Sequence, residues 1–213
     1  MNSIQQSKNR KLAQDINKVF SLSPELIEAF SNIDRESFVT SSLKHLAYKL
    51  DALPITGSQW ISSPLTVAKM SHYLECKSAD KVLEIGCGSG YQAAILSKLI
   101  RRVFTIERIE KLLNEARVRF KELGLSNIHT RLDDGQKGWR EFAKYDRILF
   151  SASILKIPDE IFEQLDTNGI LIAPIVVGNK QIITRYTKKS DKIVQENIEE
   201  CKFIEVKDGV IRG

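Results

Sequence analysis

The feature that most constrains the fold of this chain is a glycine-rich turn within residues 82–91, which read VLEIGCGSGY. The residues before the turn, KVLEI at 81–85, are typical of a buried strand that contains one acid. The residues after it, YQAAILSKLI at 91–100, carry apolar side chains at helical spacing. Glycine has no Cβ, so such a turn lets a ligand approach the start of the helix closely. The sequence therefore favours a strand, loop and helix that bind a nucleotide-like cofactor over a tight turn without a ligand.

The glycine spacing narrows the choice of cofactor. A dinucleotide-binding loop has the pattern G-x-G-x-x-G or A, whereas Gly86, Gly88 and Gly90 each lie two residues apart. A phosphate-binding P-loop has a lysine after its last glycine, and here Tyr91 stands in that place. The remaining pattern, E-x-G-x-G-x-G, resembles the first motif of class I S-adenosylmethionine-dependent methyltransferases. This resemblance implies that S-adenosylmethionine is held by Glu84, Gly86, Gly88, Ser89 and Gly90.

Composition bounds the size and class of the protein. With 213 residues, of which 42% are hydrophobic and 28% charged, the chain suits one large globular domain and is too short for two ordinary ones. Its apolar runs fall well short of the roughly 20 residues that span a bilayer, and its first residues, MNSIQQSKNRKLAQ, are polar. We therefore expect a cytoplasmic protein with no membrane partner.

The histidines and cysteines give no sign of a metal site or of a disulfide framework. The cysteines are odd in number and form no C-x-x-C pair, and the histidines are isolated from one another and from the cysteines. We therefore expect no metal at His45, His72, His129, Cys76, Cys87 or Cys201.

The net charge of +5 and the isoelectric point near 9.0 raise the question of an acidic partner such as nucleic acid. Between residues 101 and 122, however, the basic residues are interleaved with glutamates. This pattern is typical of a solvated helix surface with charge pairs along it. Without an arginine-rich block, we do not expect a nucleic-acid partner.

The part of the chain before residue 82 predicts helices and one irregular segment. Residues 9–20 and 24–33 have the spacing of amphipathic helices, and Ser23 and Pro24 have the character of an N-cap and a first helical residue. Residues 41–63 are less regular but rich in apolar and aromatic side chains, so we interpret them as functional. Pro64 then begins a third helix.

From residue 82 onward, strands and helices alternate, which predicts a doubly wound, mostly parallel α/β sheet of the Rossmann-like methyltransferase type. We expect strands at 82–85, 102–106, 128–132, 145–151 and 169–175, and helices at 91–100, 110–123 and 158–165. The tail predicts antiparallel strands at 181–186, 192–195 and 201–206, with a turn at 188–191. We expect a single domain over 1–213, composed of N-terminal helices and an active-site loop (1–63), a cofactor-binding core (64–178) and tail strands (179–213).

In a sheet of this kind ligands bind outside the carboxyl ends of the strands. The second strand ends at Glu107, close to the offset of about 20 residues from Gly86 at which an acid binds the ribose of an adenosine cofactor. The third strand is followed by Asp133, Asp134 and Gly135, where an acid can accept a hydrogen bond from an adenine amino group. For each acid the alternative is a solvated surface position.

Further motifs lie in order along most of the chain. They are LPI at 53–55, Gln59 followed by IS at 61–62 and Pro64, VLEIGCGSGYQAA at 82–94, TIER at 105–108, DG at 134–135, GW at 138–139, YD at 145–146 and IP at 157–158. Together they resemble the protein-L-isoaspartate (D-aspartate) O-methyltransferase family, from about residue 34 to residue 206. The resemblance implies an enzyme that uses S-adenosylmethionine to methylate the free carboxyl of L-isoaspartyl, and of D-aspartyl, residues in damaged proteins, which are its partners.

The same resemblance implies roles for particular residues. Ser62 is the family's active-site serine, whose hydroxyl would orient the substrate carboxylate, whereas Ser63 is better placed as the N-cap of the helix at Pro64. The substrate groove would be lined by Ile61 and Gln181 as well as Ser62, and cofactor binding would extend to Glu107, Arg108, Asp134 and Gly135.

The chemistry agrees with these residue types. A carboxylate with a pKa near 4 is already ionised at neutral pH, so it needs no general base. Orientation of the reacting groups alone can contribute roughly 7 kcal/mol. A nucleic-acid methyltransferase would instead carry an N/D-P-P-Y/F or P-C motif after the fourth strand, and the sequence FSAS at 150–153 is neither.

The sequence also departs from the family pattern. Trp60 stands where the family has threonine, Ser58 and Asp133 stand where it has glycine, and Glu205 stands where it commonly has proline. These changes affect the acceptor side more than the cofactor motif. The alternative function is therefore a methyltransferase of the same fold that acts on another acceptor, either a small molecule or a nucleic acid.

Overall fold

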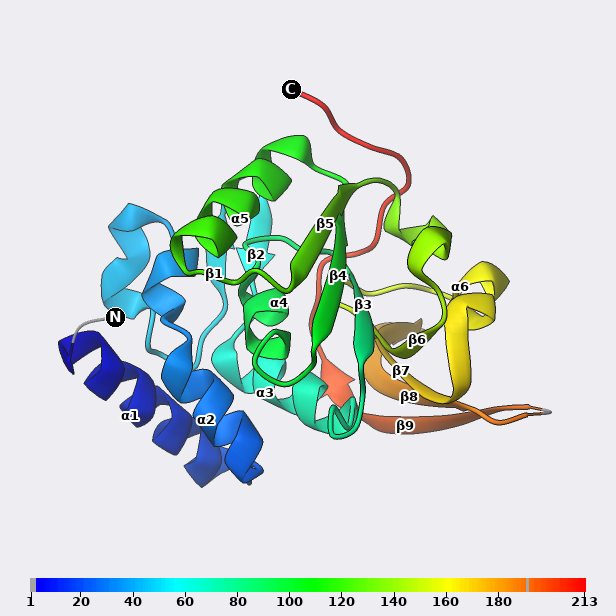
Figure 1. Ribbon diagram of the computed structural model, residues 1–213, viewed down its shortest axis with the longest axis horizontal. Coiled ribbons are helices and arrows are strands. Elements are labelled where there is room, and N and C mark those ends of the chain that lie inside the picture. Colours follow the sequence, from blue (N-terminus) through cyan, green and yellow to red (C-terminus); the bar gives the residue numbers. More distant parts are fainter. Residues whose placement is uncertain (1–2, 191) are drawn as a thin grey trace.

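One twisted sheet of seven strands lies at the centre of the computed structural model, which describes residues 3–190 and 192–213 (Figure 1). The strand order is β5-β4-β3-β6-β7-β8-β9. Their bounds are β3 (Lys81–Ile85), β4 (Arg102–Glu107), β5 (Ile128–Leu132), β6 (Tyr145–Phe150), β7 (Leu165–Val177), β8 (Lys180–Lys188) and β9 (Ile193–Cys201). Neighbouring strands are parallel from β5 to β7, and β8 and β9 continue the sheet as antiparallel strands. The predicted fold class is confirmed.

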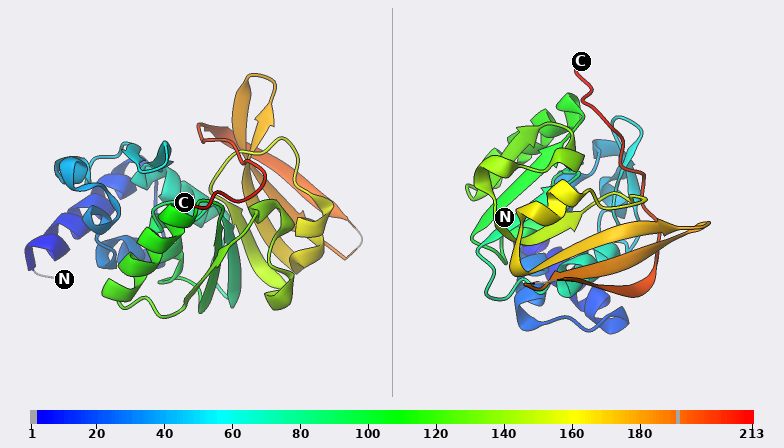
Figure 2. Two further views of the ribbon diagram at one scale, coloured as in Figure 1. Left: turned by 90° about the horizontal axis from the view of Figure 1, so that it is seen from above. Right: turned by 90° about the vertical axis from the view of Figure 1, so that its right-hand side faces the viewer.

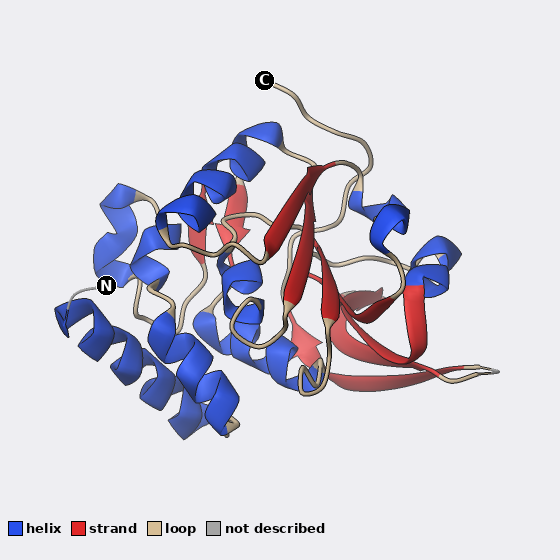
Figure 3. Ribbon diagram, in the orientation of Figure 1, coloured by secondary structure: helices blue, strands red, loops and turns tan. Residues whose placement is uncertain are grey.

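Helices cover both faces of the sheet (Figure 3). Successive residues of a strand point to opposite faces, so Val82 packs in one apolar cluster and Leu83 in the other. The first cluster includes side chains of α1 (Ser3–Val19), α2 (Pro24–Asn32), α3 (Pro64–Tyr73), α4 (Tyr91–Leu96) and α5 (Glu110–Glu122); the second includes Ile161 of α6 (Asp159–Gln164). Figure 2 shows the N-terminal helices at one end of the molecule and the β8–β9 hairpin at the other.

Two of the predicted helix starts have the expected caps. The Ser23 hydroxyl accepts a hydrogen bond from the Leu26 amide at 3.3 Å, and Pro24 is the first residue of α2. The Ser63 hydroxyl accepts one from the Thr66 amide at 3.0 Å, and Pro64 begins α3. Ser63 is therefore the cap, as predicted.

Several predicted boundaries were wrong. Helix α1 begins at Ser3, whereas the apolar spacing alone placed its start at residue 9. Helix α4 ends at Leu96 rather than residue 100, since the chain there turns toward β4. Strand β7 is longer than predicted, because pairing with β8 carries it to Val177.

The tail and the irregular segment differ most from the prediction. Residues 192–195 and 201–206 are not two separate strands: β9 is one continuous strand from Ile193 to Cys201, paired with β8. Residues 202–213 then return across the carboxyl ends of the parallel strands, with bridges from Glu205 to Ser153 and from Ile211 to Ile109. The predicted turn at 188–191 includes one residue, 191, that lies outside the described residues.

Residues 41–63 contain more structure than predicted. They hold the short 3-10 helix η2 (Ser41–Leu46) and a two-stranded hairpin of β1 (Leu53–Ile55) and β2 (Gln59–Ile61). Three further 3-10 helices in the described chain are η1 (Arg35–Phe38), η3 (Gly135–Lys137) and η4 (Arg140–Phe142).

Within residues 3–190 and 192–213, no helix is long and apolar enough to cross a bilayer. The same residues contain no group of three or more histidine, cysteine, aspartate or glutamate side chains that could hold a metal ion.

Candidate active site

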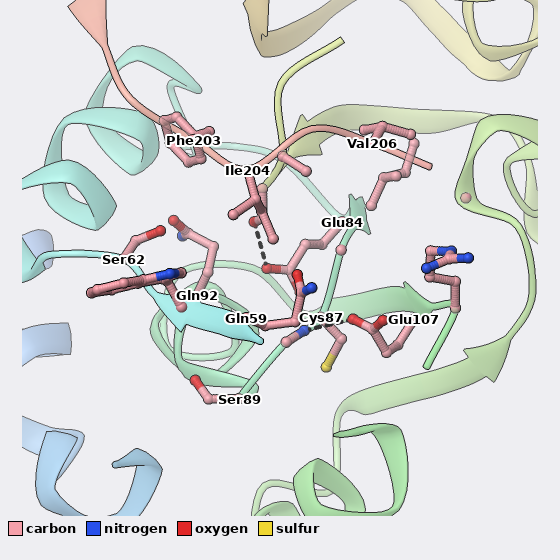
Figure 4. A pocket seen from close by; sticks show the side chains of 18 of the residues that line it. Gln59, Ser62, Glu84, Cys87, Ser89, Gln92, Glu107, Phe203, Ile204 and Val206 are labelled. Atoms are coloured by element: carbon pink, nitrogen blue, oxygen red, sulfur yellow. Dashed lines mark hydrogen bonds between the residues drawn. The ribbon is translucent and has the colours of Figure 1, made fainter. Parts of the chain in front are cut away.

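A cavity of about 420 Å³ lies at the carboxyl ends of β3, β4 and β6 (Figure 4). Its volume is in the range of ordinary small-molecule sites. Figure 4 shows Ser62 on one side, Glu107 on the other and Glu84 between them, with the segment of Phe203, Ile204 and Val206 running across the opening. The lining therefore combines the strand ends, the β1–β2 hairpin and the returning tail.

Most of the residues predicted to form the site line this cavity together. They are Ile61, Ser62, Glu84, Gly86, Gly88, Ser89, Glu107, Arg108, Gly135 and Gln181. Gly90 and Asp134 are not among the lining residues.

The glycine loop is shaped by contacts behind it as well as by the cavity in front. Gly90 has φ +90°, and a Cβ there would lie 2.6 Å from Cζ of Phe120 in α5. Gly90 therefore allows the loop to pack on α5 and is not part of the cavity lining. The Gly86 amide donates to the Ile106 carbonyl oxygen at 2.9 Å, which ties the loop to β4.

Glu84 is a fully buried acid at the end of β3. Its carboxylate accepts hydrogen bonds from the Thr105 hydroxyl at 2.6 Å and from the Ser151 hydroxyl at 2.9 Å. Burial raises the pKa of Glu84 to about 8, the two hydroxyls oppose the shift, and the Glu107 charge adds to it. Glu84 is therefore an acid whose charge would be stabilised by a cation in the cavity.

Glu107 organises the loop through both carboxylate oxygens. One oxygen accepts from the Gly88 amide at 2.8 Å and the other from the Ile109 amide at 2.9 Å. A carboxylate oxygen can accept a second hydrogen bond, so both oxygens keep capacity for a ligand hydroxyl.

Two residues predicted to bind the cofactor, Asp134 and Arg108, form hydrogen bonds to the tail at residues 208–209. The Asp134 carboxylate accepts from the Gln136 amide at 3.0 Å and from the Gly209 amide at 2.9 Å. The Arg108 guanidinium donates to the carbonyl oxygens of Asp208 and Gly209, each at 3.0 Å. Both predicted cofactor residues thus hold residues 208–209 beside the cavity.

Gly135 allows a close approach next to Asp134. A Cβ on Gly135 would lie 2.4 Å from Cγ2 of Ile85, at the end of β3. Asp133, one of the departures from the family pattern, forms an ion pair with Arg131 at 2.7 Å.

On the predicted acceptor side, Ser62 has a free hydroxyl: no hydrogen bond among the described residues uses it. Its carbonyl oxygen accepts from Nη2 of Arg35 at 3.1 Å. Ser62 thus follows the hairpin with its backbone held and its side chain available to a substrate.

Gln181 is occupied by the tail. Its amide nitrogen donates to the Phe203 carbonyl oxygen at 3.0 Å and to the Ser153 hydroxyl at 3.1 Å, and its amide oxygen accepts from the Phe203 amide at 2.6 Å. Gln181 therefore lines the cavity while it holds the tail in place.

Sequence reasoning missed several lining residues. Ser151 lies directly after β6, so the strand-end argument used for Glu107 would have identified it. Residues 203–207 reach the cavity only because β9 reverses the chain, and no local pattern signals that path. Cys87 also lines the cavity, but burial raises the pKa of its thiol, which keeps it neutral and poorly nucleophilic.

Comparison with known proteins agrees with this geometry. The family model described as Protein-L-isoaspartate(D-aspartate) O-methyltransferase matches residues 6–210. The chain belongs to this family. A protein-L-isoaspartate O-methyltransferase of Helicobacter pylori strain P12 is 53% identical over 99% of this chain and 100% of its own length. That of Dictyoglomus thermophilum is 42% identical over 94% of this chain and 91% of its own.

Solved structures show the same family fold. A protein-L-isoaspartate O-methyltransferase structure superposes with a TM-score of 0.85 at 28% identity, covering 92% of this chain and 65% of the other. A Plasmodium falciparum protein solved in complex with S-adenosyl-L-homocysteine gives a TM-score of 0.83 over 93% of this chain and 98% of its own, and at 20% identity it shows the shared fold alone.

One departure from the family pattern lies where the backbone favours glycine. Ser58 stands where the family has glycine, and it adopts φ +54°, in the left-handed region that favours glycine. Trp60, by contrast, is 52% exposed and adds an indole to the cavity wall.

Proposed function

We propose that this chain transfers a methyl group from S-adenosylmethionine to the free α-carboxyl of L-isoaspartyl residues, and of D-aspartyl residues, in damaged proteins. The observation that carries the proposal is the single cavity that joins the Glu84 glycine loop to the free Ser62 hydroxyl in a chain of this family. Methylation would begin repair, since the ester closes to a succinimide that then hydrolyses.

The cavity residues suit the methyl donor. When bound, S-adenosylmethionine supplies an electrophilic methyl group on a sulfonium. The fully buried Glu84 carboxylate has no cationic partner within the described residues, so a cation in the cavity would favour its ionised form. Glu107 would accept ribose hydroxyls, and the loop at Gly86, Gly88 and Ser89 would contact the donor. Asp134 lies outside the cavity lining and holds the tail, so it would accept from the adenine amino group with the lone pairs that the Gln136 and Gly209 amides leave free.

The acceptor needs orientation rather than activation. Its carboxylate is ionised at neutral pH, so no residue has to remove a proton. The Ser62 hydroxyl would donate a hydrogen bond that aims one carboxylate oxygen at the methyl group, while Ile61 and Gln181 line the groove around it. The tail segment 203–207 would limit the entry of water to the reacting groups.

The remaining assignments follow from this function. We place the enzyme in the cytoplasm, with isoaspartyl proteins and peptides as partners and no nucleic acid among them. The chain would act as one domain: residues 1–63 supply helices and the active-site loop, 64–178 the cofactor-binding core, and 179–213 the tail strands.

The test supplies methyl-labelled S-adenosylmethionine with an isoaspartyl peptide and, separately, with its aspartyl twin. Label on the isoaspartyl peptide alone is expected. Equal label on both peptides, or on neither, would contradict the proposal. Label on tRNA or DNA, or on a small molecule, would support the alternative acceptor instead.

A further inference from the structure

Arg35 is a fully buried arginine without a carboxylate partner. It has zero exposed surface and is the first residue of η1. Among the described residues, no aspartate or glutamate forms an ion pair with it. Burial lowers its pKa, and a buried charge of this kind is costly unless its hydrogen-bonding groups are satisfied.

Backbone carbonyl oxygens accept from the two terminal nitrogens of the guanidinium, whereas its buried Nε has no hydrogen-bond partner among the described residues. Nη1 donates to Ala47 at 2.6 Å and, more weakly, to Lys49 at 3.5 Å. Nη2 donates to Asp51 at 2.9 Å and to Ser62 at 3.1 Å. One side chain thus holds the segment before β1 and the residue after β2, which are the two ends of the hairpin that lines the cavity.

The same guanidinium reaches the cofactor loop. Its Cζ lies 5.6 Å from the ring centroid of Tyr91, a cation–π distance. Tyr91 is the first residue of α4, directly after the glycine loop, and it lines the cavity. Arg35 therefore contacts the acceptor side and the cofactor side from behind the cavity, without lining it.

We propose that Arg35 is a positioning residue for methyl transfer, which acts by fixing the Ser62 backbone so that the Ser62 hydroxyl meets the substrate carboxylate. This rests on the proposed function, in which Ser62 orients that carboxylate. The planar fork of arginine suits the task, because it places two donors on carbonyls from separate segments. Lysine would keep the charge but offers a single nitrogen in place of the fork.

A double-mutant cycle tests whether Arg35 acts through Ser62. In the wild-type background, Arg35→Lys is expected to lower kcat/KM for an isoaspartyl peptide about tenfold, since small misplacement of an orienting group costs about that much or more. In the Ser62→Ala background, the same substitution is expected to change kcat/KM less than about twofold. An equal loss in both backgrounds would overturn the proposal.

Two further measurements separate positioning from loss of structure. The affinity of Arg35→Lys for S-adenosylhomocysteine, measured by calorimetry, is expected to stay within about threefold of wild type. A parallel loss of this affinity would show that Arg35 supports the whole site rather than Ser62, and would overturn the proposal. The matched control is Tyr48→Phe, which removes the 2.6 Å hydrogen bond to Asp34 in the same region without touching Ser62. Tyr48→Phe is expected to keep full turnover, and a loss like that of Arg35→Lys would overturn the proposal.

If Arg35→Lys fails to fold, a measurement on the wild-type protein still tests the proposal. The guanidinium proton resonances of Arg35 in isotopically labelled protein are expected to be sharp, and to shift when isoaspartyl peptide is added. Unchanged resonances at saturating peptide would overturn the link to the acceptor site. If the wild-type protein methylates neither peptide, the proposed function itself fails, which is a different outcome from an additive cycle.

Discussion

The two halves of the cavity are held together in different ways. The proposed cofactor half comes from neighbouring strand ends. Two of its acids are bonded to backbone and hydroxyl groups of the sheet and its loops: Glu107 to the Gly88 amide and Glu84 to the hydroxyls of Thr105 and Ser151. The acceptor half combines the β1–β2 hairpin, Gln181 of β8 and the tail at 203–207. The first is set mainly by the sheet, with the tail contacting it at Arg108 and Asp134, whereas the second depends throughout on contacts between distant parts of the chain.

The two halves also differ in how freely their structure can vary between related proteins. The pairing register of β3, β4 and β6 fixes where these strands end relative to one another, so the proposed donor site has little freedom to vary. The hairpin and the tail carry three of the four departures from the family pattern, at Ser58, Trp60 and Glu205. The acceptor half is therefore where this chain can differ from its relatives, and substitutions on each side test that division.

The largest effect is expected from Glu84→Gln in the cofactor half. Folding raises the pKa of Glu84 to about 8. Ionisation of this carboxyl therefore costs more free energy in the folded protein than in the unfolded chain, so the ligand-free protein loses stability as the pH rises from about 4.5 to 8. Removal of the charge is expected to stabilise the protein by on the order of 4 kcal/mol above pH 8 and to flatten this pH dependence. Urea unfolding of both proteins across this pH range measures the difference in stability. The affinity of the variant for S-adenosylmethionine is expected to fall.

A wild-type protein whose stability did not decline over this interval would contradict the assignment of Glu84 as a buried, penalised acid. Ser97→Ala gives a comparison outside the cavity, since within the described part of the chain the Ser97 hydroxyl donates only to the Ala94 carbonyl oxygen. It should leave the shape of the pH profile unchanged.

Gly90→Ala is expected to destabilise the protein by about 3 kcal/mol, because positive φ and contact with Phe120 add together. The matched control is Gly124→Ala, which has φ +65° and no atom within 4 Å of the new Cβ. Strain alone predicts a loss of about 1 kcal/mol there. Thermal unfolding of both variants gives the comparison, and equal losses would show that packing on α5 does not shape the loop.

In the acceptor half, Ser62→Ala is expected to lower kcat/KM for an isoaspartyl peptide about 30-fold, the value of one hydrogen bond to a charged group, roughly 2 kcal/mol. Ser63→Ala removes the α3 cap instead. It is expected to cost about 1 kcal/mol of stability and to leave turnover unchanged. Steady-state kinetics and unfolding on both variants separate the roles, and a fully active Ser62→Ala would remove Ser62 from the mechanism.

Trp60→Thr is expected to have the smallest effect. The indole is 52% exposed, so stability should change by less than about 0.5 kcal/mol. Because Trp60 lies in the cavity wall, KM should change a few-fold and in a way that depends on the residues beside the isoaspartyl group. Kinetics with peptides that differ only at those neighbours measure this. The same change in KM for every peptide would mean that Trp60 does not contact the residues beside the isoaspartyl group.

The cofactor half was largely predictable from the sequence because its signals are local. The strand before Gly86, the spacing to Glu107 and the turn at Gly135 all lie within one alternating segment, and the structure brings them to one edge of the sheet. Gly90 shows the limit of that reasoning: it was predicted to bind the cofactor, but it does not line the cavity and a Cβ there would meet Phe120.

The acceptor half resisted prediction for a physical reason. Residues 53–61 form a hairpin too short for a periodic signal, and 203–207 have no regular structure of their own beyond one bridge at Glu205. Arg35 gave no signal at all, since an arginine in a polar stretch looks solvated until its four carbonyl partners are assembled.

The returning tail also affects the order in which the parts of the cavity form during folding. A large part of the chain separates Ser62 from Phe203, and Gln181 joins the latter to the sheet only after β8 has paired. Contacts between residues so distant in sequence form late in folding, because the entropy lost when the long intervening loop closes must be offset by structure that has already formed. A chain with β3, β4 and β6 in place would therefore bring Glu84 and Glu107 together before Gln181 and the tail complete the cavity beside Ser62.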